Sequence, residues 1–338
     1  MDEIPNHSLP PLPGDFPPGM PAPPAPRYNI FTGPHGLRAG WLLLIFVVLL
    51  VATIFFWSVV FGLMIYIFNG GKIPPALQMP RPGFFILQEA ISLLALFFTM
   101  LIISRFEHRS IDSYGLSLRR AFRSTFWVGS VLGFVSLTAL LLAIRRFHGF
   151  YFGSIALSGR TLLHYAMLWA IAFLMVALWE EYVFRGYSQF VLARGMRFWW
   201  AAIVTSLLFG LVHATNRGES PVGLASVVAV GLFFCLTLRR TGDLWFAVGF
   251  HAAWDYAQTF VYGVPDSGLP AVGHLFNSHF QGPTWLTGGS VGPEASALVF
   301  PVLGLAALVV AWLYPDSKYP EPEAAVAPSS PGPAPALS

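Results

Sequence analysis

The sequence predicts an all-α polytopic membrane protein with about eight transmembrane helices. Of its 338 residues 55% are hydrophobic and only 10% are charged, whereas about a quarter of the residues in a soluble domain are charged. The apolar residues also gather in long runs with few charges, and a helix is the structure that satisfies its own backbone hydrogen bonds within lipid. These two observations exclude an ordinary soluble core.

The apolar runs set the expected boundaries of the helices. The predicted spans cover residues 41–68, 84–104, 126–144, 162–184, 199–215, 222–238, 244–262 and 295–314. The first span is too long for the apolar part of a signal peptide and no basic segment precedes it, so we expect it to be retained. The fifth and sixth spans are short.

The chain divides into one membrane domain and two tails. Residues 1–39 hold eleven prolines and residues 315–338 are rich in Pro, Ala and Ser, so both are expected to be disordered. Residues 40–314 form the membrane domain, and residues 263–293 are interpreted as a connecting loop. The single cysteine, Cys235, excludes an internal disulfide and any Cys-rich metal site.

Positively charged residues predict the orientation. An even number of spans places both termini on one side, which also carries most Lys and Arg residues, including Arg119, Arg120, Arg239 and Arg240. Cytoplasmic loops are enriched in such residues. We therefore expect both termini to be cytoplasmic, most simply in a bacterial inner membrane. The sequence contains no long basic run, so nothing in it suggests nucleic acid as a partner.

Ionisable side chains within apolar spans indicate function, because they are costly in lipid. Glu180 and Glu181 are adjacent in LWEEYVFRGYSQF, and Arg185 follows Glu181 by four residues. Arg185 can therefore hold Glu181 on one helix face, which leaves Glu180 to abstract a proton. A salt bridge at the membrane edge is the competing interpretation. Glu89 and His164 are interpreted as interfacial or locally bonded.

Two later spans carry histidines. His213 in LLFGLVHATN follows Phe209 by one turn, and His251 in GFHAAWDYAQ precedes Asp255 by one turn. Either group alone is typical of a polar residue bonded within its own helix. Together with the first group they are what water activation and oxyanion stabilisation need. His213 meets Glu180 only if the fourth span extends beyond Glu181 or the fifth begins later than residue 199.

The three groups are also sequence motifs. EEYVFR matches EExxxR, Phe209 to His213 matches FxxxH, and His251 to Asp255 matches HxxxN/D. In this order the motifs resemble those of the CPBP family, which includes type II CaaX prenyl proteases and bacteriocin-processing enzymes. The resemblance covers residues 160–262, and SYGLSLRR and GGSVGPE extend it over most of the membrane domain.

The resemblance implies an intramembrane endopeptidase whose prenyl-protein members cleave after a prenylated cysteine. Carried over, Glu180 and His213 activate water and Glu181 and Arg185 orient the site. His251 and Asp255 resemble the pair that polarises the scissile carbonyl. The type II CaaX proteases have Asn in place of Asp255, and an ionised aspartate cannot donate to an oxyanion.

The alternatives concern metal and activity. Glu180, His213, His251 and Asp255 are ligand types suited to zinc, so the sequence is compatible both with a metalloprotease and with a metal-free glutamate mechanism. The expected substrate is a membrane protein or a lipidated peptide within the bilayer. A non-catalytic scaffold or immunity-type protein of the same family is the main alternative function, and a proton-coupled transporter is disfavoured because no inverted repeat is present.

Overall fold

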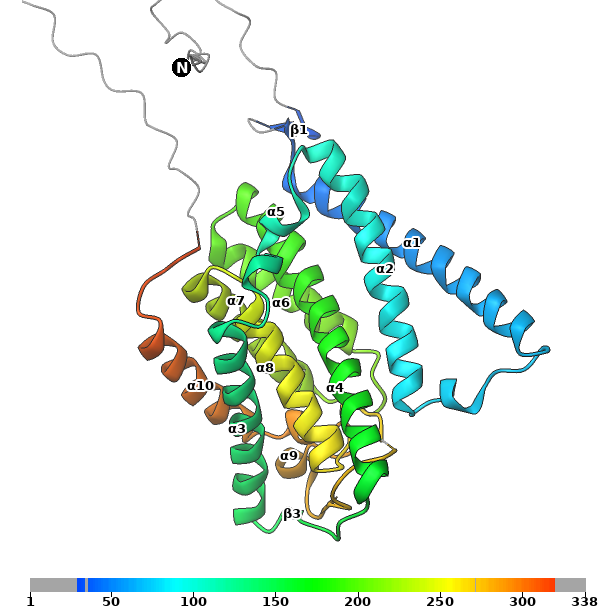
Figure 1. Cartoon of the computed structure of the whole chain (residues 1–338). Helices are drawn as coiled ribbons and strands as arrows, with labels where there is room; N and C mark the ends of the chain where they lie inside the picture. Colours follow the sequence, from blue (N-terminus) through cyan, green and yellow to red (C-terminus); the bar gives the residue numbers. More distant parts are fainter. Residues whose placement is uncertain (1–28, 34–35, 271, 320–338) are drawn as a thin grey trace, which may run out of the picture.

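The computed structural model describes residues 29–33, 36–270 and 272–319, and these form an all-α bundle (Figure 1). All eight predicted spans fall on helices. The long helices are α1 (Ala39–Phe68), α2 (Pro82–Glu107), α3 (Ser124–Arg146), α4 (Gly159–Glu181), α6 (Phe198–His213), α7 (Pro221–Thr241), α8 (Trp245–Tyr256) and α10 (Val299–Leu313). The chain is thus an integral membrane protein of the predicted fold class.

Short elements connect these helices. They are β1 (Thr32–Gly33), β2 (Gly36–Leu37), η1 (Pro75–Leu77), η2 (Ile111–Tyr114), η3 (Leu118–Arg120), β3 (Phe150–Tyr151), η4 (Tyr182–Ser188), α5 (Gln189–Gly195), η5 (Ala257–Val261), β4 (His279–Phe280), α9 (Thr284–Thr287) and η6 (Pro293–Ala295). β1 pairs with β2 and β3 with β4, both antiparallel. The second pair ties the loop after η5 to the segment before α4.

Not every helix has the length of a full membrane span. Five stretches are long and apolar enough by length and composition: α1, α2, α3, α7 and the kinked helical stretch over residues 159–195. α6 and α10 are shorter apolar helices, and α8 has 12 residues before it continues into the π-helix η5. The helices of three predicted spans are therefore shorter than a full membrane span.

The fourth helix bends close to its predicted end at residue 184. α4 ends at Glu181, and helical residues continue through the π-helix η4 and α5 to Gly195. The backbone at Gly186 is not helical, with φ −79° and ψ −109°, and marks a kink between the two parts. Glu180 lies one residue before the end of α4, and His213 is the last residue of α6. Both side chains line the cavity described below.

Glycines allow α3 and α8 to pack backbone to backbone. A Cβ atom built on Gly133 would lie 2.2 Å from the carbonyl oxygen of Phe250, and one on Gly249 would lie 2.2 Å from that of Phe126. Such spacing between small residues is how membrane helices approach closely. The contact fixes α8, and with it His251, against the rest of the bundle.

The two ends of the described chain lie near each other. Most of both predicted tails falls outside the described residues. Inside them, the Tyr319 ring contacts Phe190 with centroids 4.9 Å apart, and the residues around Ala39 border the end of α5 at Gly195. Both ends therefore leave the bundle next to α5, as an even number of spans requires.

Candidate active site

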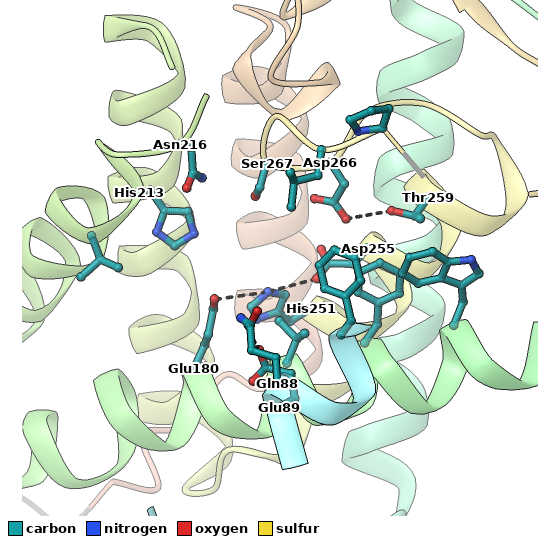
Figure 2. A pocket seen from close by; sticks show the side chains of 17 residues that line it. Gln88, Glu89, Glu180, His213, Asn216, His251, Asp255, Thr259, Asp266 and Ser267 are labelled. Carbon is teal, nitrogen blue, oxygen red and sulfur yellow. Dashed lines mark hydrogen bonds and ion pairs between the residues drawn. The ribbon is translucent and has the colours of Figure 1, made fainter. Parts of the chain in front are cut away.

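A cavity of about 260 Å³ opens between α2, α4, α6 and α8 and the loop after η5. Its polar lining residues are Gln88, Glu89, Glu180, His213, Asn216, His251, Asp255, Thr259, Asp266 and Ser267, and Figure 2 shows their side chains around the space. The structure thus brings four of the six predicted site residues to one cavity. The other two, Glu181 and Arg185, lie behind the cavity wall in the bundle core.

Glu181 and Arg185 form a fully buried pair that supports the site. Both side chains have no exposed surface, and Arg185 Nη1 lies 3.3 Å from Glu181 Oε1. The same Glu181 oxygen lies 3.0 Å from His251 Nδ1. Because a carboxylate only accepts, His251 carries a hydrogen on Nδ1. The predicted pairing is therefore a structural support for His251.

The other nitrogen of His251 faces two more carboxylates. Nε2 lies 3.3 Å from Asp255 Oδ2 and 3.7 Å from Glu180 Oε2. All three groups line the cavity (Figure 2). Since every neighbour of this ring is an acceptor, its contacts are best satisfied when both nitrogens carry a hydrogen. Asp255 is therefore placed as a partner of His251.

His213 is held in a single tautomer. Its Nδ1 lies 2.9 Å from the carbonyl oxygen of Phe209, so Nδ1 must donate and Nε2 keeps its lone pair. Nε2 is then available to accept a hydrogen bond in the cavity. Figure 2 shows the imidazole and the Glu180 carboxylate on the same side of that space.

Phe209 links the first two motifs. The guanidinium carbon of Arg185 lies 4.1 Å from the centre of the Phe209 ring, within the range of a cation–π contact. The Phe209 ring also contacts the imidazole of His213, with centroids 4.4 Å apart. An aromatic residue one turn before His213 thus orients the imidazole and covers the buried cation.

The loop after η5 contributes residues that the sequence did not single out. Asp266 and Ser267 line the cavity, so residues 263–293 do more than connect two helices. Thr259 Oγ1 donates to Asp266 Oδ2 over 3.0 Å. Glu294 accepts from the Ser267 N–H at 2.8 Å and from Gln258 Nε2 at 2.5 Å. Glu294 thereby pins the loop, and its place in GGSVGPE was the one signal in the sequence.

The loop carboxyls have a low tendency to ionise. Burial raises the pKa of Asp266 well above its usual range, and the charges of Asp255 and Glu294 raise it further. Burial also raises the pKa of Glu294 to about 8, although hydrogen bonds from Ser267 and Gln258 act in the opposite direction. At neutral pH both loop carboxyls therefore favour the neutral form.

Glu89 was predicted to be interfacial or locally bonded. It accepts a hydrogen bond from its neighbour Gln88 at 3.4 Å, which agrees with local bonding, and it is also 6% exposed and lines the cavity. His164, by contrast, is exposed on α4 and contacts the ring of Tyr165. The span position of Glu89 was visible in the sequence, but its direction toward the cavity was not.

The predicted zinc set does not assemble as a metal site. Among the residues that the structure describes, no group of three or more His, Cys, Asp or Glu side chains is arranged to hold a metal ion. His251 contacts carboxylates at both nitrogens, so its ring is engaged in hydrogen bonds on both sides.

The comparisons agree with the motifs. Curated proteins and solved structures give no significant match to the chain. The family model described as "Type II CAAX prenyl endopeptidase Rce1-like" matches residues 162–257, the stretch that holds all three motifs. The resemblance predicted from EExxxR, FxxxH and HxxxN/D is therefore confirmed, and residues 162–257 of this chain are type II CAAX prenyl endopeptidase Rce1-like in sequence.

Proposed function

We propose that the chain is an intramembrane endopeptidase that hydrolyses a peptide bond inside the cavity between α2, α4, α6 and α8. The convergence of Glu180, His213 and His251 on one space carries this proposal. It supplies a carboxylate base, an imidazole acceptor and an imidazole donor, which are the groups that hydrolysis of an amide requires. The match to the CAAX endopeptidase family supports the same reaction class.

In the first step Glu180 takes a proton from water. The other O–H of that water donates a hydrogen bond to His213 Nε2, because Nδ1 of the ring is bonded to the Phe209 carbonyl. The water is thereby oriented with a lone pair toward the substrate. Its oxygen then bonds to the carbonyl carbon, and the carbonyl π electrons move to the oxygen to give a tetrahedral oxyanion.

In the second step His251 stabilises the oxyanion through Nε2–H. Glu181, at 3.0 Å from Nδ1, keeps the opposite side of the ring in place. Asp255 lies 3.3 Å from Nε2 and favours the charged ring, which explains how an aspartate serves where the family has asparagine. Glu180 then gives its proton to the leaving nitrogen, the C–N bond breaks, and an acid and an amine result.

Arg185 acts by position and does not touch the substrate in this mechanism. It neutralises Glu181 in the core at 3.3 Å and rests on the Phe209 ring. One buried cation thus fixes both the carboxylate behind His251 and the aromatic residue beside His213. A buried charge of this kind persists because it is paired.

The proposed substrate is a membrane protein or a lipidated peptide that reaches the cavity from the bilayer. The termini are proposed to be cytoplasmic, in a bacterial inner membrane. Both ends of the described chain leave next to α5, which supports a common side. A reporter fused after residue 319 and active only outside the cytoplasm contradicts this orientation.

The test is cleavage of a quenched farnesylated CaaX peptide by the purified protein in nanodiscs. We expect wild type to cleave it and Glu180→Gln to lose about 10³-fold or more in kcat/KM, as for other residues that act as a catalytic unit. Asp316→Asn, an exposed carboxylate after α10, is the matched control and should keep the wild-type rate. Equal turnover by wild type and Glu180→Gln contradicts the proposal.

The same preparation distinguishes the alternatives. A scaffold or immunity-type protein predicts no cleavage by wild type and a cellular phenotype that survives Glu180→Gln. Metal analysis by mass spectrometry of the active protein, before and after a chelator, tests the geometry of the site. Activity without stoichiometric metal agrees with the side-chain mechanism, whereas activity lost with the metal and restored by zinc contradicts it.

A further inference from the structure

Glu89 is a buried carboxylate that lacks a partner for one of its oxygens. The residue is 6% exposed, and its Oε2 has no hydrogen-bond partner. Its Oε1 accepts only a long bond of 3.4 Å from Gln88 Nε2. A buried acceptor without a donor lowers the stability of the fold. A hydrogen-bond donor on a bound ligand would satisfy this oxygen. The proposed hydrolysis leaves this carboxylate unused.

The unpartnered oxygen belongs to the catalytic cavity. Glu89 and Glu180 both line it (Figure 2), and the Glu180 carboxylate lies 3.7 Å from His251 Nε2. A ligand that meets Glu89 is therefore also near the base that starts the reaction.

The lining of the cavity is mainly acidic. Four carboxyl groups line it, and none of its lining residues is Lys or Arg. The buried Arg185 is taken up by Glu181 behind the wall. The basic side chains of the lining are His213 and His251, so acidic groups outnumber basic ones. Carboxylates repel an acidic ligand, whereas they can form ion pairs and hydrogen bonds with a cation.

An aromatic wall leads to these carboxylates. The Trp169 ring lies 5.4 Å from Phe85 and 5.2 Å from Phe173, the latter stacked, and all three line the cavity. Lys and Arg side chains place their apolar stems along such surfaces and their charged heads at a polar end. Aromatic faces also attract the cation itself.

We propose that the cavity binds a Lys or Arg side chain of the substrate next to the scissile bond, with Glu89 as the carboxylate that receives it. The inference rests on the proposed endopeptidase function and adds its substrate class. Glu89 is then a specificity residue that contacts the substrate, and the Phe85–Trp169–Phe173 wall holds the stem of the bound side chain.

The test is a set of quenched peptides that carry Lys, norleucine or Glu in turn at each position around the scissile bond. At one position we expect kcat/KM for Lys to exceed that for norleucine by about tenfold or more, the size of a hydrogen bond to a charged group, with Glu poorer than both. In Glu89→Gln the Lys-to-norleucine ratio should fall to below about threefold. Glu89→Asp should recover part of it, and Asp316→Asn should keep it.

Binding of fluorescently labelled Lys and norleucine peptides to the same variants separates this inference from catalysis. Tighter binding of the Lys peptide that is lost in Glu89→Gln supports the cation site even if no peptide is cleaved, in which case only the endopeptidase proposal fails. Equal binding and cleavage of Lys and norleucine peptides at every position overturns the inference. A Lys preference that survives in a folded Glu89→Gln protein, with unchanged melting temperature, also overturns it.

Discussion

Helices α1 and α8 differ in length, in hydropathy and in how much of each helix is buried inside the protein. α1 has 30 residues and a mean hydropathy of 2.9 over its best window, yet only 11% of that window is buried inside the protein. α8 has 12 residues, of which Trp245, Phe246, Ala247, Val248, Gly249, Phe250, Trp254 and Asp255 are buried. Most side chains of α1 are thus exposed on the surface of the bundle, whereas most side chains of α8 contact other parts of the protein.

The difference follows from what surrounds each helix. Figure 1 shows α1 and α2 at one edge of the bundle, whereas α8 contacts α3, α4 and α7. An apolar side chain on α1 faces lipid and loses little when it changes. On α8 the same change meets a neighbouring backbone or the catalytic cavity. Substitutions in the two regions should therefore differ in size and even in sign.

The largest expected effect concerns the cavity histidine. His213→Ala removes the acceptor that orients water, and kcat/KM should fall by about 10²–10⁴-fold, the range for acid–base groups. His164→Ala, on the exposed face of α4, is the matched control and should stay near wild type. Peptide cleavage in nanodiscs measures both. Similar losses in the two variants would mean that position in the cavity does not matter.

The next effect concerns the buried cation. Arg185→Ala removes the guanidinium at 3.3 Å from the buried Glu181 carboxylate and leaves His251 as its remaining partner; the loss of one member of a buried ion pair costs about 3–5 kcal/mol. The apparent melting temperature in detergent should drop strongly, and activity should fall with it because His251 loses its support. Arg81→Ala, exposed before α2, should change stability by less than about 0.5 kcal/mol. A stable, active Arg185→Ala protein contradicts the positioning role.

Two glycines test the comparison directly. A Cβ on Gly133 of α3 meets the Phe250 carbonyl oxygen at 2.2 Å, whereas a Cβ on Gly62 of α1 meets nothing within 4 Å. Gly133→Ala should destabilise the protein by about 1–3 kcal/mol through overpacking. Gly62→Ala should be neutral or stabilise by up to about 1 kcal/mol, because alanine is the better helix former. Shifts of the same sign in thermal unfolding would break the contrast.

A further effect, spread over several pH units, is the pH dependence of stability. Burial raises the pKa of Glu294 from its ordinary value of 4.5 to about 8, so between these values the folded protein binds more protons than the unfolded chain. Stability should then be fully present below this window and fall as pH rises through it, by at most about 1.4 kcal/mol per pH unit for one group. Glu294→Gln should flatten the melting temperature between the same limits. An unchanged slope contradicts the burial of this carboxyl.

The sequence predicted most of the fold because hydropathy acts locally. All eight spans and their order agree with the helices, and the three motifs identified the residues that converge on the cavity. The predicted end of the fourth span, at residue 184, lies close to the kink at Gly186. The sequence did not show that Glu181, Arg185 and Gln189 are buried within the bundle, so that helical structure continues beyond the kink to Gly195.

Other parts of the site could not be predicted from the sequence, because they depend on how the helices and loops pack in the folded protein. Glu89 was recognised as an ionisable residue in an apolar span, but its place in the cavity wall depends on the packing of α2 on α4. Asp266 and Ser267 lie in a loop whose path is set by Glu294, 27 residues after Ser267. A contact at this separation leaves no periodic pattern in the sequence. Polar residues near motif helices therefore merit attention even when local spacing assigns them no role.

The most direct measurement of the central claim is peptide cleavage in water enriched in oxygen-18, followed by mass spectrometry of the products. If Glu180 activates water in the cavity, wild type yields a new C-terminal carboxyl group with one atom of oxygen-18, and Glu180→Gln yields no product above background. Cleavage by Glu180→Gln at the wild-type rate, with the same isotope incorporation, would contradict the account.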